Sequence, residues 1–244
     1  KINSLWMYFE KIAMSKTIKK LIRLVLKNFS FLLILFALFL NNNLRSEETE
    51  KKFIGFVDSL EGSVNKEDVD DLIKLNAFDQ IFTNDKIKIG SNSSIVVSFI
   101  DNSILTLQSD SEFLVEKFDK ISEEPSFIIA ITKGKFAFES GTIAKNDKGI
   151  MKIKLGEMEI DLKGTAITGG FSGGEITIAL VEDTMKNTGE IKVSTGDETI
   201  TITEAHAGLK LSKDTPMEKT TMSEEEIIKA ADAMSKAVVK ASTT

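Results

Sequence analysis

The alternation of apolar and charged residues over positions 151–163 constrains the fold more than any other feature of this sequence. Apolar residues occupy every second position on both sides of Gly156, in Met151-Lys-Ile-Lys-Leu-Gly-Glu-Met-Glu-Ile-Asp-Leu-Lys163. A period of two is typical of β-strands that bury one face. Lysines fill the polar positions before Gly156 and mostly acids fill those after it, which favours ion pairs between neighbouring strands. The tight connection at Leu155–Glu157 is either a hairpin or a sharp bend between stacked strands.

The same period recurs from Phe53 to about Ser212, so the sequence predicts an all-β body of many short strands. We expect the first two strands to lie on either side of a turn at Asp58–Ser59. The acidic stretch 65–76 is expected to be a short helix or a solvated loop. A twisted solenoid and a sandwich both bury alternating strands, because the two arrangements differ only in which strands pair.

The best-defined turn lies at Asp101-Asn102, between two runs rich in β-branched and other apolar residues, 94–99 and 104–107. Asn adopts the left-handed backbone conformation more readily than most residues, and it is common in tight hairpins. The sequence therefore predicts a two-residue hairpin here, with Asn102 at positive φ.

Residues 1–46 have the order of regions of an export signal. A basic stretch from Lys16 to Lys27 precedes Phe29–Leu40, which is apolar apart from Ser30, and a polar stretch follows up to Ser46. The apolar run is shorter than the ~20 residues that a membrane-spanning helix needs. We expect a signal that begins near Met14 and is cleaved near Ser46, so that the protein is periplasmic or secreted. An uncleaved anchor in the inner membrane is the alternative.

Residues 213–244 are expected to form a linker and a C-terminal amphipathic helix, after an export segment at 1–46 and a β domain at 47–212. Ser223 and Glu226 have the spacing of a capping box. A narrow apolar stripe then follows a helical period through Ile227, Ala231, Met234 and Val238. Such a helix either docks against the β body or binds a partner.

Composition and motifs argue against catalysis and against nucleic-acid binding. The chain has no cysteine, and residues 47–244 carry 23 basic and 36 acidic residues, so a net charge of −13 would repel phosphate backbones. His206 is the only histidine, and we interpret it as a turn or edge residue. We predict no catalytic residue, no cofactor and no metal site.

Two further motifs have a structural interpretation. The glycine-rich stretch 164–174 lacks the Lys-Ser/Thr pair and the following helix of a phosphate-binding loop. Its glycines therefore predict a sharp bend between strands and a close approach of backbones. The acidic stretch 68–71 lacks the glycine and the terminal glutamate of a calcium loop, and we interpret it as a solvated loop.

Eight short motifs occur in order along the β body: Gly55–Val57, Leu60–Gly62, Asp79–Phe82, Asp85–Gly90, Ser94–Phe99, Asp101–Leu107, Ile131–Gly134 and Lys163–Thr165. In this order they resemble the FecR-type domain of bacterial envelope proteins, over roughly Phe53 to Ser212. The resemblance implies an exported, twisted, solenoid- or sandwich-like β domain without catalysis. It also implies a link to surface signalling, in which a FecR-type regulator receives a signal from an outer-membrane transporter.

The sequence departs from this family in two places. Only residues 14–28 would precede the apolar run if Met14 starts the chain, too few for the segment with which signalling regulators contact a sigma factor. Asn102 stands where glycine is common, a mild change because Asn also reaches positive φ.

We therefore expect a non-enzymatic envelope domain that acts as a protein-interaction or scaffolding module, with an envelope protein as its partner. A module that binds peptidoglycan or another glycan is the alternative. It is weakened because Trp6 and Tyr8, the only Trp and Tyr, precede the mature body and leave only Phe for stacking on sugars. A membrane-anchored FecR-type signalling regulator is the lesser alternative. Contact with a membrane is expected only through an uncleaved N-terminal segment.

Overall fold

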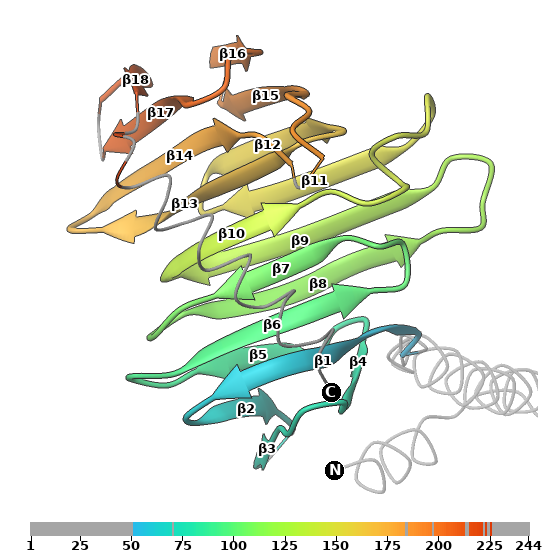
Figure 1. Cartoon of the computed structure of the whole chain (residues 1–244). Helices are drawn as coiled ribbons and strands as arrows, with labels where there is room; N and C mark the ends of the chain where they lie inside the picture. The colour runs from blue at the N-terminus through green and yellow to red at the C-terminus, as the bar shows by residue number, and fades with distance from the viewer. Residues whose placement is uncertain are drawn as a thin grey trace, which may run out of the picture. The chain divides into compact units, whose positions relative to one another are not determined.

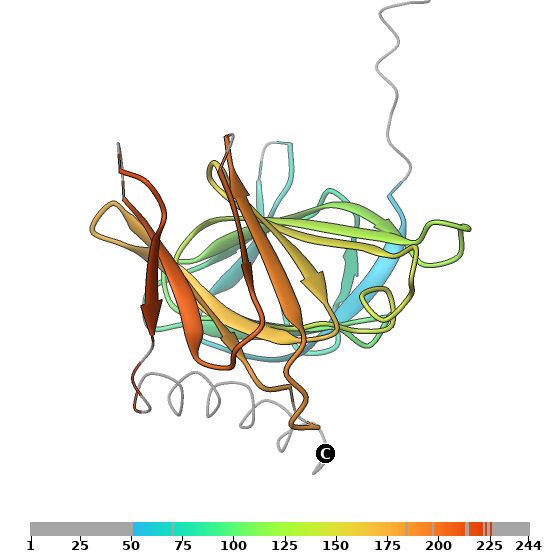
Figure 2. The same ribbon diagram turned by 90° about the horizontal axis from the view of Figure 1, so that it is seen from above.

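The computed structural model describes residues 51–69, 71–183, 185–196, 198–212, 215–221, 223 and 225. These residues form eighteen strands in two nine-stranded sheets that face each other (Figures 1 and 2), which confirms the all-β prediction. The predicted export segment, and all of the predicted C-terminal helix except Ser223 and Glu225, lie outside the described residues. Within the described ranges, no helix is both long enough and apolar enough to cross a membrane.

The strands alternate between the two sheets along the chain. In spatial order, sheet A consists of β18 (Glu218–Thr221), β17 (Ala207–Ser212), β14 (Glu175–Val181), β13 (Ala166–Ser172), β10 (Lys135–Glu139), β7 (Ile104–Leu107), β6 (Ser94–Phe99), β1 (Phe53–Glu61) and β4 (Gln80–Phe82). Sheet B consists of β16 (Glu198–Ile202), β15 (Glu190–Thr195), β12 (Met158–Lys163), β11 (Ile150–Leu155), β9 (Ser126–Lys133), β8 (Glu112–Asp119), β5 (Lys86–Ile89), β2 (Val64–Glu67) and β3 (Leu72–Lys74). Because β18 pairs with β17, sheet A continues past residue 212.

The two sheets are open, and the solenoid alternative is wrong. The chain places successive hairpins in alternate sheets, such as β6–β7 in sheet A and β8–β9 in sheet B. As a result, strand neighbours run antiparallel, and only β9–β11 is parallel among the described pairs. Stacked solenoid coils would instead place parallel strands side by side.

A shared core lies between the sheets. Phe127 on sheet B contacts Phe99 and Phe138 on sheet A, with ring centroids 4.7 and 5.9 Å apart. Edge-to-face aromatic pairs of this kind add about 0.5–1.5 kcal/mol beyond the burial of their area. These rings therefore join the sheets near the middle of the sandwich.

The alternating segment 151–163 forms the β11–β12 hairpin. The tight connection at Leu155–Glu157 is therefore a hairpin turn and not a bend between stacked strands. Lys152 pairs with Glu159 at 2.6 Å and with Asp161 at 3.6 Å, so the predicted cross-strand ion pairs are confirmed. The Lys152 ammonium donates to the Glu159 carboxylate and lowers the pKa of that carboxyl. This outer face of sheet B is charged and accessible to solvent.

Two predictions near the start of the body are wrong. β1 runs without a break through Asp58 and Ser59, and a register shift against β6 accommodates one additional residue of β1 there. The predicted turn falls later, at Gly62. The acidic stretch 65–76 is neither a helix nor only a loop. It contains β3 and the end of β2, which pair at the edge of sheet B.

The turn between β6 and β7 has three residues and not two. Asn102 N donates to Phe99 O and Phe99 N donates to Ser103 O, both at 2.9 Å, which closes the loop over residues 100–102. Asn102 has a φ of 68°, so the predicted left-handed residue is confirmed. Three-residue hairpins commonly combine a type I turn with one residue of this conformation.

Asp101 is a buried side chain in this turn and not a solvated turn residue. Its carboxylate accepts from Ser103 N at 3.1 Å and from Ser103 Oγ at 2.9 Å. Ser103 Oγ in turn accepts from Gly141 N at 2.8 Å, which ties the turn to the end of β10. Burial raises the pKa of Asp101, although the hydrogen bonds from Ser103 act in the opposite direction.

This burial gives Asp101 a distinct pH dependence. A raised pKa in the folded state means that the neutral carboxyl stabilises the fold below the unfolded pKa, and that this contribution is lost as the pH rises through the folded pKa. We expect the free energy of unfolding of the wild type to fall relative to Asp101→Asn between acidic and neutral pH. Urea unfolding of both proteins across this range measures the difference, because shared surface carboxylates cancel. Parallel pH profiles would contradict the expectation.

Candidate interaction surface

Exposed large apolar side chains are concentrated at one end of the sandwich. Six of the ten in the described residues lie between positions 53 and 78: Phe53, Phe56, Val69, Leu72, Ile73 and Phe78. This end carries the edge strands β3 and β4, whereas the edge strands at the opposite end, β16 and β18, contribute none among their described residues. Apolar groups gathered on a surface commonly mark an interaction site.

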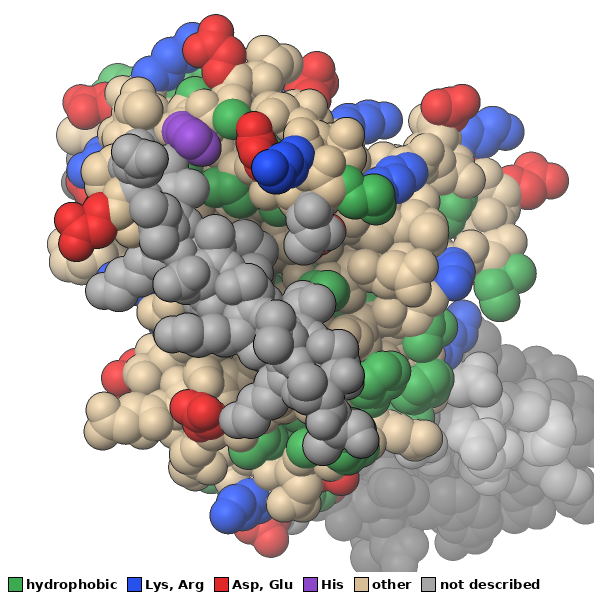
Figure 3. Space-filling model, viewed as in Figure 1, with side chains coloured by type: hydrophobic (Ala, Val, Ile, Leu, Met, Phe, Trp, Pro, Cys, Tyr) green, Lys and Arg blue, Asp and Glu red, His purple; other side chains and the backbone are tan. Residues whose placement is uncertain are grey.

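Four phenylalanines line the edge of sheet A, and we call Phe53, Phe56, Phe78 and Phe82 the phenylalanine edge. Phe53 on β1 and Phe82 on β4 meet edge to face, with ring centroids 6.1 Å apart. Phe56 lies further along β1, opposite Gln80 of β4. Phe78 precedes β4 and is 70% exposed at a φ of 71°. Hydrophobic side chains gather around the start of β1 on the face shown in Figure 3.

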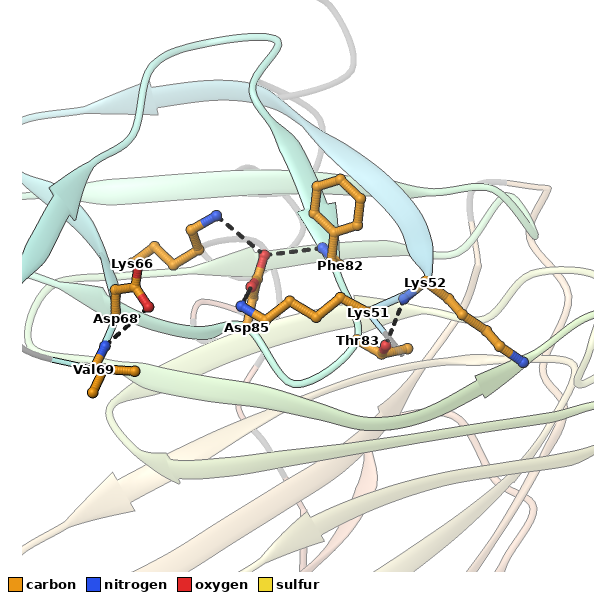
Figure 4. Close-up of polar contacts among 8 residues, drawn as sticks. All are labelled: Lys51, Lys52, Lys66, Asp68, Val69, Phe82, Thr83 and Asp85. Carbon is orange, nitrogen blue, oxygen red and sulfur yellow. Dashed lines mark hydrogen bonds and ion pairs between the residues drawn. The ribbon is translucent and has the colours of Figure 1, made fainter. Parts of the chain in front are cut away.

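A buried carboxylate holds this edge in place (Figure 4). The Asp85 side chain is inaccessible to solvent and accepts from Phe82 N at 3.0 Å. Two ammonium groups approach it, Lys51 Nζ at 3.1 Å and Lys66 Nζ at 3.6 Å. Because Lys51 precedes β1 and Lys66 lies on β2, Asp85 connects β4 to both sheets.

Hydrogen bonds between the residues around Asp85 and the start of the body occupy polar groups at the same edge. Thr83 N donates to Lys52 O, and Lys52 N donates to Thr83 Oγ1, both at 2.9 Å. Thr83 N faces β1, so the amide of Phe82, one residue earlier, points away from the sheet. The Asp85 carboxylate accepts the hydrogen bond that this amide donates. An occupied amide hinders pairing with an added strand. The phenylalanine side chains are therefore the groups that this edge offers to a partner.

The neighbouring strands β2, β5 and β8 of sheet B carry paired charges. Glu67 lies 3.2 Å from both Lys86 and Lys88, and Lys86 also lies 3.1 Å from Glu112. Hydrogen bonds from Lys88 and Lys86 lower the pKa of Glu67. The end of the sandwich thus combines an aromatic edge on sheet A with a band of paired charges on sheet B.

The residues singled out for possible chemistry are spread across the fold. His206 lies in the turn between β16 and β17 at a φ of 70°, and its backbone N donates to Leu180 O at 2.7 Å. Asp68 and Asp71 accept from Val69 N and Leu72 N within their own loop. No three His, Cys, Asp or Glu residues among those described are placed to hold a metal ion.

The glycine-rich stretch forms β13 and the turn that leads into β14. A Cβ added at Gly169 would lie 2.4 Å from Thr177 O, and one at Gly170 would lie 2.4 Å from Gly134 O. The predicted close approach of backbones is therefore confirmed. The prediction of a sharp bend corresponds to the β13–β14 hairpin.

Sequence reasoning missed both parts of this surface. Asp85 precedes an alternating strand, but nothing in its local pattern indicates burial or the two distant lysines. The sequence places Phe53 and Phe56 in the first strand and gives no assignment to Phe78, because alternation places a residue on a face without showing whether that face is covered. The detectable signal is Phe78 itself, a large apolar residue close to Asn76, Asp79 and Gln80 in a stretch without alternation.

Comparison with known proteins gives a family match over part of the chain. The family model described as FecR protein matches residues 85–186, less than half of the chain, and the resemblance drawn from the motifs is confirmed over that stretch. The match begins at Asp85, the residue that holds the phenylalanine edge. It indicates no enzyme family. No curated protein matches the sequence.

Two crystal structures of a candidate anti-sigma factor from Parabacteroides distasonis are similar in fold. They share 7% and 8% sequence identity with this chain, with TM-scores of 0.48 and 0.47. Each comparison covers 59% of this chain and 62% of the other protein, so the chain spans about three fifths of the length of these proteins.

Proposed function

We propose that this protein is a non-enzymatic interaction or scaffolding module of the bacterial cell envelope, and that the phenylalanine edge binds an apolar segment of a partner protein. The proposal rests on the concentration of exposed phenylalanines beside β4, the edge strand that the Asp85 carboxylate holds in place. Aromatic side chains bury a large area at low entropic cost, which makes them frequent anchors at interfaces. The match to the FecR family model supports a regulatory or interaction role.

Phe78→Asn tests this role, because it removes an exposed ring at a position where Asn fits the backbone better. Asn tolerates the φ of 71°, so the melting temperature should stay the same or rise. Cross-linking in envelope preparations, followed by mass spectrometry, should show partner capture reduced about tenfold, the effect of losing ~1.4 kcal/mol at an anchor. Ile121→Asn is the control, since Ile121 is 94% exposed in the β8–β9 loop.

The outcomes separate this proposal from glycan binding. Loss of one captured protein in Phe78→Asn, and its retention in Ile121→Asn, would support the protein-interaction role. An unchanged capture profile in Phe78→Asn would contradict it. Retention of the wild type on purified sacculi would favour a peptidoglycan-binding module, for which exposed Phe rings are the available stacking surface.

Export is the second part of the proposal and rests on residues 1–46. The basic, apolar and polar regions in this order support a cleaved signal. Mass measurement of the protein from cell fractions should give a chain that starts near residue 47 in the periplasm. An intact N-terminus in the inner membrane would support the anchored signalling regulator instead, and full-length protein in the cytosol would contradict export.

A further inference from the structure

The two edge strands beside the phenylalanine edge differ in what their backbones offer to a partner. β3 and β4 lie at the same end of the sandwich (Figure 1). On β4 the Phe82 amide is occupied by the Asp85 carboxylate. β3 is the last strand of sheet B, and among the described strands it pairs only with β2. β3 is therefore the strand at this end whose outer backbone groups can meet another chain.

The hydrogen bonds between β2 and β3 show which backbone groups face outward. Leu75 N, just after β3, donates to Val64 O at 2.9 Å. Backbone groups of successive residues in an antiparallel strand point to opposite sides, so Ile73, two residues earlier, also faces β2. The N–H and C=O groups of Leu72 and Lys74 consequently point away from β2, where sheet B has no further strand.

Three of these four outward groups are available to a partner. The Asp71 carboxylate accepts from Leu72 N at 2.8 Å, so this amide is occupied. Leu72 C=O, Lys74 N–H and Lys74 C=O have no hydrogen-bond partner among the residues that the structure describes. The edge of β3 thus presents an acceptor, a donor and a second acceptor. One carbonyl and two amides of an added strand would satisfy all three.

The side chains of β3 add an apolar surface and one charge. Leu72 is 53% exposed and Ile73 is 43% exposed, on opposite faces of the strand. Lys74 is exposed and forms no ion pair with any described residue. The lysines of the neighbouring strands β2 and β5 are all paired with acids: Lys66, Lys86 and Lys88. A carboxylate flanked by apolar residues is therefore the chemistry that complements β3.

We infer that β3 binds an extended segment of the partner protein as an added strand, with an acidic side chain opposite Lys74 and apolar residues on either side of it. Backbone pairing supplies affinity. The carboxylate fixes the register, because a shift by one residue would move it to the other face of the sheet. The inference rests on the proposed function, since Phe78 follows Lys74 by four residues and at most about 14 Å of chain separates the two sites.

A second copy of β3 does not supply this chemistry. Lys74 is the only charged residue of the strand. Pairing two β3 strands would bring two ammonium groups to one edge with no carboxylate between them, and like charges on paired strands are destabilising. The occupant is therefore a segment of a different sequence.

A synthetic peptide, acetyl-Thr-Val-Glu-Val-Thr-amide, tests the inference. It presents one carboxylate between β-branched residues, and its sequence reads the same in both directions. In NMR spectra of the full chain, millimolar peptide should slow hydrogen exchange of the Lys74 amide at least about threefold, which corresponds to occupancy of about two thirds. The amide of Thr201, on the edge strand β16 of sheet B, should exchange at an unchanged rate.

Two control peptides separate the contributions of charge and backbone. A peptide with Lys in place of Glu has the wrong charge, and a peptide with N-methylated Glu keeps the charge but cannot donate to Lys74 C=O. Neither should slow exchange at Lys74. In Lys74→Glu the preference should reverse, so that the Lys peptide slows exchange at position 74 and the Glu peptide does not. Equal effects of all three peptides, or no effect of the Glu peptide, would overturn the inference.

Phe78→Asn separates failure of this inference from failure of the proposed function. Loss of partner capture in Phe78→Asn without any peptide effect at Lys74 would overturn strand addition alone. Slowed exchange at Lys74 with unchanged partner capture in Phe78→Asn would overturn the proposed role of the phenylalanine edge and leave strand addition in place. Slowed exchange at Lys74 in concentrated protein without peptide would overturn the inference and identify a second copy as the occupant.

Discussion

Gly134→Ala should destabilise the β domain by about 3 kcal/mol or more, the sum of a strained backbone and an overpacked corner. Gly134 has a φ of 88°, in the left-handed region that side chains disfavour. An added Cβ would lie 1.9 Å from Ser111 Oγ and 2.5 Å from Ser111 Cα. Ser111 is fully buried where the chain passes from sheet A to sheet B, so it cannot move away.

Gly173→Ala is the matched control for this prediction. Gly173 has a φ of 59°, and an added Cβ there would meet nothing within 4 Å. Its replacement should cost only the backbone strain, about 1 kcal/mol. Urea unfolding of both variants measures the difference. A second variant, Ser111→Gly on the Gly134→Ala background, should restore stability in part, because it removes the Ser111 side chain but leaves its Cα. Equal losses in the two Ala variants would show that the corner can relax.

The strands were predictable because burial on one face produces an alternation of apolar and polar residues in the sequence. The alternation around Gly156 reproduced the β11–β12 hairpin with its ion pairs, and Asn102 marked the turn between β6 and β7. Strand pairing was not predictable in the same way. Hairpins that alternate between two sheets and hairpins stacked as a solenoid bury the same residues, so periodicity does not distinguish them.

The outer face of sheet A and the phenylalanine edge were harder to predict, for opposite reasons. On β14 the apolar residues form a continuous run, Ile178–Val181, which is typical of strands buried on both faces. That signal was present but was interpreted as one-sided burial. The phenylalanine edge has no such signal, because its position depends on Asp85, whose partners Lys51 and Lys66 lie 34 and 19 residues earlier in the chain.

Asp85→Ala should lower the free energy of unfolding by about 2–4 kcal/mol, because it leaves Phe82 N–H and two ammonium groups without their acceptor. The Lys66 side chain is 19% exposed, so water restores little of its lost ion pair. Asp85→Asn keeps an acceptor for Phe82 N but removes the charge, and it should cost about half as much. Asp68→Ala is the control, since Asp68 accepts only from the exposed Val69 N and its loss should cost at most about 0.5 kcal/mol.

Amide hydrogen exchange shows whether the loss arises at the edge itself. Exchange at Phe82 should accelerate strongly in Asp85→Ala and modestly in Asp85→Asn, because only the amide variant still accepts its hydrogen bond. If Asp85 holds the phenylalanine edge in its binding shape, the Ala variant should also lose partner capture while it remains folded at low temperature. Unchanged protection at Phe82 would show that β4 is held by its pairing with β1 alone, and that the carboxylate acts only on the two lysines.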